Sequence, residues 1–211
     1  MPTLREVLDL RPCVSRTVAA AVARGWGGRP DDPDRGSLAP AYLQAVLGDR
    51  EIPWVEVLDI VGLHDSIWLI GRLSAWLGSR LRLFAADCAE RALLREREAG
   101  REPDDRSWEA LRVSRAYARG DAGAVALLDA YQSAVAAAAA DLGGGYPSLA
   151  AERAATPGCG AVFSAAVADT LYAATEAAGC AAHGDLRDGA AVADEIAWQA
   201  ARLREMLEEE A

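Results

Sequence analysis

The segment RLRLFAADCAERALLREREAG, residues 80–100, places its apolar side chains on one side of an α-helix. Positions three or four apart lie on the same helical face, and this segment fills them with residues suited to a core. The predicted buried stripe consists of Leu81, Phe84, Ala85, Cys88 and Ala92. On another face Asp87 and Arg91 stand four positions apart, so we expect them to form an ion pair. The segment therefore predicts a helix that packs into the interior of the protein.

Helical spacing of this kind recurs along most of the chain, between residues that start or stop helices. Thr3 and Glu6 have the S/T-x-x-E form of a capping box. Asp104 or Asp105 is suited to cap the start of a helix, and Gly120 is suited to close one. The segments with helical spacing are residues 12–24, 38–49, 53–62, 65–78, 80–100, 105–120, 121–142, 147–156, 160–179 and 188–208.

Three of these segments allow a more detailed prediction. His64, Asp65 and Ser66 offer caps for residues 65–78, a segment that is apolar on nearly every side and is expected to be central. The expected inner face of residues 121–142 consists of Ala124, Leu128, Tyr131, Val135, Ala138 and Leu142. The expected inner face of residues 160–179 consists of Phe163, Val167, Leu171 and Ala174. The other faces of this last segment are mostly alanine, which lets neighbouring helices approach closely.

The composition favours helix over strand. Alanine is in large excess, aromatic residues make up only 6% of the chain, and β-branched runs are nearly absent. Neither β-α-β alternation nor a hairpin signal occurs, and no repeat of fixed period is present. We therefore predict an all-α fold, a helical array or irregular bundle of about nine or ten helices. The 211 residues are expected to form a single domain with an exposed Gly-, Pro- and Asp-rich loop at about residues 25–37.

The charge balance limits the classes of partner. The chain has 22 basic residues, all of them arginine, 32 acidic residues and a net charge of -10. This charge argues against binding to nucleic acid or to anionic membranes and suits a basic protein partner. No apolar run of 18 residues and no leader-like start occurs. We therefore expect a cytoplasmic protein.

No motif for a metal, cofactor or catalytic site is present. The four cysteines Cys13, Cys88, Cys159 and Cys180 are scattered, and we expect all of them to be free thiols. Cys180 and His183 have C-x-x-H spacing, but a closed zinc site needs a second pair of ligands. A Cys–His catalyst could use only His64 or His183 as its base. Neither G-x-G-x-x-G nor a P-loop occurs. We expect no metal, no cofactor and no enzymatic activity.

Five residues are candidates for binding a partner. Arg112, Arg115 and Arg119 occupy one stripe of their helix and could form an anion-binding or acidic-partner patch. The alternative is a solvated face in which these arginines are balanced by Glu90, Glu96, Glu98 and Glu109. Trp26 in the exposed loop and Trp108 near a helix start could act as aromatic anchors. Trp26 could equally fold back and cover the core.

The stretch DCAERALLREREAGREPDDRSWEALRVSRAYARGDA, residues 87–122, resembles a bacterial family of immunity proteins, the Imm-5-like group. The pieces that match are residues 87–93, residues 104–121 and the alanine-rich run at about 122–183, and the resemblance covers about residues 80–205. The sequence departs from the family pattern where Ser107 and Trp108 replace the usual Arg-Pro. The resemblance implies an all-α fold and binding to a toxin domain, and it carries no catalytic residues.

Three functions follow, in order of preference. The first is an intracellular immunity protein that neutralises a cognate bacterial toxin, with a basic toxin domain as its partner. The second is a helical scaffold or adaptor, which could self-associate and has no toxin partner. The third is an enzyme, which would require a pocket that holds His64 or His183 beside a cysteine.

Overall fold

The computed structural model describes residues 1–3, 6, 51–140, 146–158, 160–183 and 188–209. Within these residues every regular element is helical, apart from one isolated β-bridge between Thr3 and Glu51, so the all-α class is confirmed. The elements are α4 (Trp54–Val61), α5 (Leu63–Leu73), the short 3-10 helix η2 (Ala75–Leu77), α6 (Gly78–Glu98), α7 (Asp105–Arg119), α8 (Ala124–Ala140), α9 (Tyr146–Ala154), α10 (Gly160–His183) and α11 (Gly189–Glu208).

The eight α-helices among the described residues fall slightly below the nine or ten that we expected. The predicted helices at 12–24 and 38–49, the loop at 25–37 and its Trp26 lie outside the described residues. The capping box is present, because the Thr3 amide donates to the Glu6 carboxylate at 2.8 Å and Thr3 Oγ1 accepts from the Glu6 amide at 3.3 Å.

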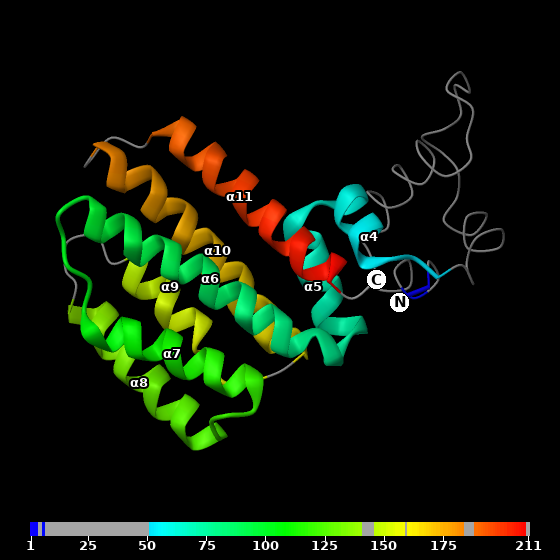
Figure 1. Ribbon diagram of the computed structural model, residues 1–211, viewed down its shortest axis with the longest axis horizontal. Helices are drawn as coiled ribbons and strands as arrows, with labels where there is room; N and C mark the ends of the chain where they lie inside the picture. Colours follow the sequence, from blue (N-terminus) through cyan, green and yellow to red (C-terminus); the bar gives the residue numbers. More distant parts are fainter. Residues whose placement is uncertain (4–5, 7–50, 141–145, 159, 184–187, 210–211) are drawn as a thin grey trace.

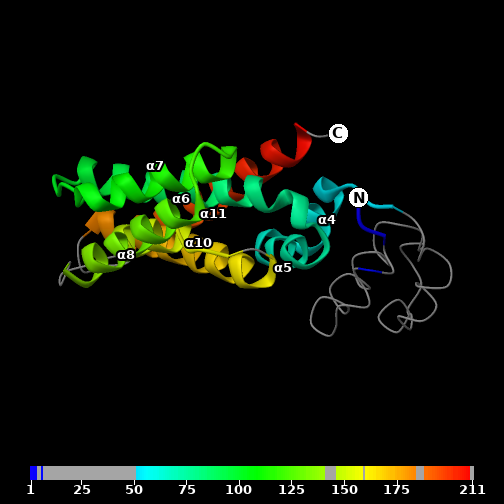
Figure 2. The same cartoon turned by 90° about the horizontal axis from the view of Figure 1, so that it is seen from below.

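Helices α6 and α10 form the middle of the bundle (Figure 1). Helix α6 packs against α7, α9, α10 and α11, and α10 packs against α5, α6, α9 and α11. Figure 2 shows α7 on one side of the body and α8 and α10 on the other. Helix α8 lies at an edge of the bundle, where it packs against α7 and α9 (Figure 1).

Helix α6 has the buried stripe that its spacing predicts. The side chains of Leu81, Phe84, Ala85, Cys88 and Ala92 are at most 3% exposed. The predicted Asp87–Arg91 ion pair is wrong. Asp87 instead pairs with Arg115 of α7 and Arg202 of α11, and Arg91 pairs with Glu195 of α11. Partners on neighbouring helices therefore replace the partner within α6, because α6 is surrounded on several sides.

Several predicted helix ends are confirmed. Asp104 caps α7 by accepting a hydrogen bond from the Arg106 amide, and Gly120 closes α7 with φ of 83° in the left-handed region. Asp188 caps α11. The predicted caps of α5 are wrong, because this helix begins at Leu63 directly after Gly62, which has φ of 82°. The segment 65–78 is also not one helix, since it is interrupted at Ser74.

The predicted inner face of α8 is wrong. Leu128 and Val135 are exposed, and the buried residues of this helix are Leu127, Ala130, Ala134 and Ala137. The physical reason is that alanine makes up nine of the 17 residues of α8, so that its apolar residues cover most of the circumference. The predicted inner face of α10 is confirmed, because Phe163, Val167, Leu171 and Ala174 are all buried. Ala166, Ala173 and Ala177 are buried on a neighbouring side of α10, as close helix packing requires.

Arg82 of α6 joins the end of α9 to α10. Its side chain is 3% exposed, and its guanidinium donates to the carbonyl oxygens of Ala154 at 3.5 Å, Thr156 at 3.0 Å and Gly158 at 3.1 Å. The guanidinium carbon also lies 3.9 Å from the centre of the Phe163 ring. Burial lowers the pKa of Arg82 to about 10, so the group stays charged at neutral pH. Arg82 therefore stabilises carbonyl groups at the C-terminal end of α9.

Candidate functional site

A groove of about 510 Å³ runs between α7 and α8. Residues of α7 form one wall, residues of α8 form the other, and we call this feature the α7–α8 groove. Its lining residues are Asp105, Arg106, Glu109, Arg112, Val113, Ala126, Asp129, Ala130 and Ser133. Val113 and Ala130 are buried and form an apolar floor, while the charged side chains of the rim are exposed. This arrangement resembles the apolar centre and polar rim of protein–protein interfaces.

Arg112 is the predicted candidate that lies in the groove. Its Nε donates to Glu109 at 2.7 Å, three residues away on the same helix, and both side chains are exposed. The hydrogen bond to Arg112 lowers the pKa of Glu109, and the same bond raises the pKa of Arg112. Exposed pairs of this kind contribute little to stability. The guanidinium can therefore turn from Glu109 to a carboxylate of a partner at low cost.

The other two arginines of the predicted stripe lie elsewhere. Arg119 is exposed at the end of α7 and pairs with Asp121 at 3.2 Å. Arg115 is half-buried and joins α7 to α6, since it donates to Asp87 at 2.8 Å and to Glu90 at 2.7 Å. The structure therefore does not bring the three arginines into one patch. The alternative of a balanced charged face describes their surroundings better, with Asp87 and Asp121 as additional partners.

Neither tryptophan candidate lies in the groove. Trp108 is half-buried against the main core, and Arg97 of α6 lies over its ring at 5.3 Å. Its indole therefore belongs to the contact between α6 and α7. Trp26 lies outside the described residues.

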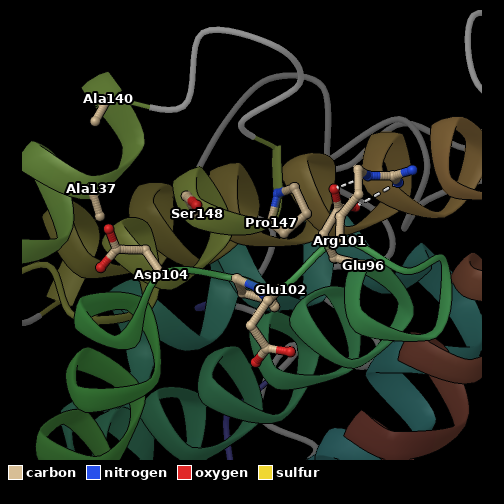
Figure 3. A pocket seen from close by; sticks show the side chains of 9 residues that line it. Glu96, Arg101, Glu102, Asp104, Ala137, Ala140, Pro147 and Ser148 are labelled. Carbon is tan, nitrogen blue, oxygen red and sulfur yellow. Dashed lines mark hydrogen bonds and ion pairs between the residues drawn. The ribbon is translucent and has the colours of Figure 1, made fainter.

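Another cavity, of about 310 Å³, lies where the connection between α6 and α7 meets α8 and α9 (Figure 3). Figure 3 shows Asp104 near Ala137 at one end and the Arg101–Glu96 ion pair at the other. Hydrogen bonds from the side chain and amide of Arg106 lower the pKa of Asp104 to about 2. Asp104 and Glu96 are thus already engaged in a helix cap and an ion pair. No lining residue of this cavity is a histidine or cysteine.

A buried polar cluster between α6, α10 and α11 escaped the sequence reasoning. Glu195 of α11 is 1% exposed, accepts a hydrogen bond from Arg91 at 2.8 Å and forms an ion pair with Arg95 at 2.9 Å. Gln199 donates to Glu195 at 3.1 Å and also contacts the Leu171 carbonyl and Thr175 Oγ1, both at 3.3 Å. The sequence of α11 does contain a pattern that indicates this cluster. Glu195 and Gln199 share one side of α11 with the core residues Leu203 and Met206, where polar residues are unusual.

Cys88 is an inert thiol. Burial raises its pKa well above the usual 9.0, and the nearby carboxylates of Glu195 and Asp87 act in the same direction. We expect iodoacetamide to alkylate Cys88 in the native protein at least about a hundredfold more slowly than the half-exposed Cys180, because a thiolate must form and be reached. Peptide mapping by mass spectrometry measures both rates. Equal rates would contradict the buried position, and equal labelling in denaturant is the control.

Glu152 of α9 is a buried carboxylate whose pKa is raised by burial, an effect that Arg153 partly offsets. A folded-state pKa above the unfolded value of 4.5 means that the native state is favoured below pH 4.5 and loses this advantage as pH rises through the folded pKa. Glu152→Gln should therefore raise the free energy of unfolding at pH 7 by about 1 kcal/mol and have little effect at pH 4. Urea titrations at both pH values test this, and a loss of stability at pH 7 would refute it.

Catalytic geometry is not evident among the described residues. His64 is exposed on α5, and the side chain of His183 lies outside what the structure describes. Cys88 and Cys180 are free thiols, whereas Cys13 and Cys159 lie outside the described residues. Within the described part of the chain, no group of three or more His, Cys, Asp and Glu side chains is arranged to hold a metal ion.

Comparisons with protein families, curated proteins and solved structures found no match for this chain. The resemblance to immunity proteins therefore stays a prediction. Among the described helices, none is both long and apolar enough to cross a membrane.

Proposed function

We propose that the protein acts by binding another protein, and that this partner is a bacterial toxin domain which it neutralises. The observation that carries the proposal is the α7–α8 groove, with its apolar floor and exposed charged rim. The helices that form its walls fall within the segments that resemble immunity proteins, because α7 spans Asp105–Arg119 and α8 follows directly in the alanine-rich run.

The charge of the groove favours a basic partner. Its rim carries the three carboxylates Asp105, Glu109 and Asp129 against the two guanidinium groups Arg106 and Arg112. The whole chain has a net charge of -10, which would speed the approach of a basic toxin domain. Arg112 would then act as an anchor in the groove, since arginine is enriched among the residues that dominate interface energies.

A helical scaffold or self-associating protein is the second candidate function. The specific observation in its favour is the set of exposed apolar side chains on α8, namely Val125, Leu128 and Val135. An enzyme remains the third candidate, and none of the described cavities supports it.

The test is co-expression with a toxin-like protein encoded beside the gene, with growth of the host as the measurement. The wild-type chain should restore growth. Ala126→Arg should abolish rescue and weaken binding of the purified toxin at least about a hundredfold, because a long charged side chain would fill the groove. The matched control is Ala193→Arg, which changes an exposed alanine of α11 and should leave rescue intact.

A histidine double variant separates binding from catalysis. His64→Ala combined with His183→Ala should leave rescue unchanged if the protein acts by binding alone. Loss of rescue in this variant, or turnover of a metabolite by the purified wild-type protein, would overturn the proposal. Equal rescue by Ala126→Arg and Ala193→Arg would show that the toxin does not bind in the groove.

A further inference from the structure

Helix α8 has two opposite faces, only one of which is used in the bundle. The inner face consists of Leu127, Ala130, Ala134 and Ala137, which are buried against α7 and α9. The outer face carries three exposed apolar side chains, namely Val125 at 73%, Leu128 at 43% and Val135 at 37% exposed. No described helix covers this outer face, because α8 lies at the edge of the bundle (Figures 1 and 2).

The outer face has the spacing of a coiled-coil seam. Its positions are Val125, Leu128, Gln132, Val135 and Ala139, all of them exposed. They alternate in steps of three and four residues, which is the a/d pattern of a two-stranded coiled coil. Val125 takes an a position and Leu128 the following d position, a combination that favours parallel dimers. We call these five residues the α8 seam.

Charge identifies the occupant of the seam. Asp129 is the single charged residue of α8, whereas 26% of the whole chain is charged. A strongly charged partner would find no opposite charge on the seam. Two copies of a chain with net charge -10 repel one another over most of their surface, and a face without charge is where they can approach. The seam therefore fits a second copy of this chain.

Gln132 adds self-complementarity. A side-chain amide both donates and accepts hydrogen bonds, so it can pair with its own copy across a two-fold axis. Single polar residues at a positions fix the register and the number of strands in coiled coils. We propose that the α8 seam is a homodimer contact in which two copies of α8 pack in parallel, with Gln132 facing Gln132 of the second copy.

The size of the seam sets the strength of the dimer. Val125 and Ala139 are 14 residues apart, which corresponds to about 21 Å along the helix. Two heptads of contact bury less surface than a standard stable interface, so the dimer is reversible and forms in the micromolar range. None of the seam residues lines the α7–α8 groove. Dimerisation and toxin binding are therefore separate properties, and each can fail without the other.

Sedimentation equilibrium of the full chain between about 1 and 500 µM tests the proposal. The wild-type protein should convert from monomer to dimer in this range. Leu128→Glu should weaken the dimer at least about a hundredfold, because each copy would place a carboxylate in the seam. Ile196→Glu is the matched control, since Ile196 is a similarly exposed apolar residue of α11, and it should dimerise like wild type. Far-UV circular dichroism confirms that both variants fold.

Cross-linking tests the orientation. Gln132→Cys should form a disulfide-linked dimer on mild oxidation, because parallel packing brings the two residues together. Ser133→Cys, one position away and in the groove, should not form it beyond the wild-type background. The α8 seam is not a homodimer contact if the wild-type protein stays monomeric at 500 µM. The same conclusion follows if Leu128→Glu and Ile196→Glu dimerise equally. Cross-linking of Ser133→Cys as efficient as that of Gln132→Cys would overturn the parallel arrangement.

Discussion

Glu195→Gln should lower the free energy of unfolding by about 3 kcal/mol, because removing one partner of a buried ion pair leaves the other charges uncompensated. The carboxylate is 1% exposed, receives hydrogen bonds from Arg91 and Gln199, and forms a further ion pair with Arg95. The amide has nearly the same shape but no charge, so packing is preserved and the change reports on electrostatics. Urea unfolding at pH 7, followed by circular dichroism, gives the difference.

The matched control is Glu205→Gln on the same helix. Glu205 is mostly exposed and pairs with Arg202 at 3.0 Å, so its loss should change stability by no more than about 0.5 kcal/mol. If the two variants unfold at the same urea concentration, the cluster around Glu195 does not stabilise the contact between α6 and α11.

Arg82→Met should lower the free energy of unfolding by about 3 kcal/mol. Two effects oppose one another at this site. Burial of the guanidinium is unfavourable, as its pKa of about 10 indicates, but its removal leaves the carbonyls of Ala154, Thr156 and Gly158 without this donor. The Ala154 carbonyl keeps its hydrogen bond from Ser114 Oγ, whereas the part-buried carbonyls of Thr156 and Gly158 lose a charged donor. A hydrogen bond to a charged group contributes about 1.5–3 kcal/mol, so we expect the loss of the donor to dominate. Methionine keeps the apolar contact with the Phe163 ring.

Arg119→Met provides the comparison, since Arg119 is an exposed arginine of α7 and its loss should have an effect within about 0.5 kcal/mol. Arg82→Met with wild-type stability would show that the unfavourable burial of the charge cancels its three hydrogen bonds.

The inner face of a helix was predictable where large apolar residues contrast with small or charged neighbours. In α6, Phe84 and Leu81 mark the inner face against charged neighbours, and in α10 Phe163 and Leu171 stand out among alanines. In α8 the contrast is lost, because alanine suits a core and a surface equally. The inner face there depends on which neighbours surround the helix, and its own sequence does not contain that information.

The polar contacts were less predictable than the helices. Spacing within one helix suggested that Asp87 pairs with Arg91, but ion pairs between helices depend on the bundle packing, which brings Arg115 and Arg202 to Asp87. The α7–α8 groove has the same origin, since it requires two helices to be placed side by side. Of the five binding candidates, Arg112 lines this groove.

The alanine-lined sides of α10 imply an unusual sensitivity to mutation. Ala166, Ala173 and Ala177 are buried on α10, a helix that packs against α5, α6, α9 and α11. In most cores the damaging changes are truncations, which leave voids. At these positions little side chain remains to truncate, and any larger residue has to push a helix away. A deep mutational scan of α10 would therefore show tolerance to glycine and serine at sites that reject valine and leucine, the reverse of the usual hydrophobic preference.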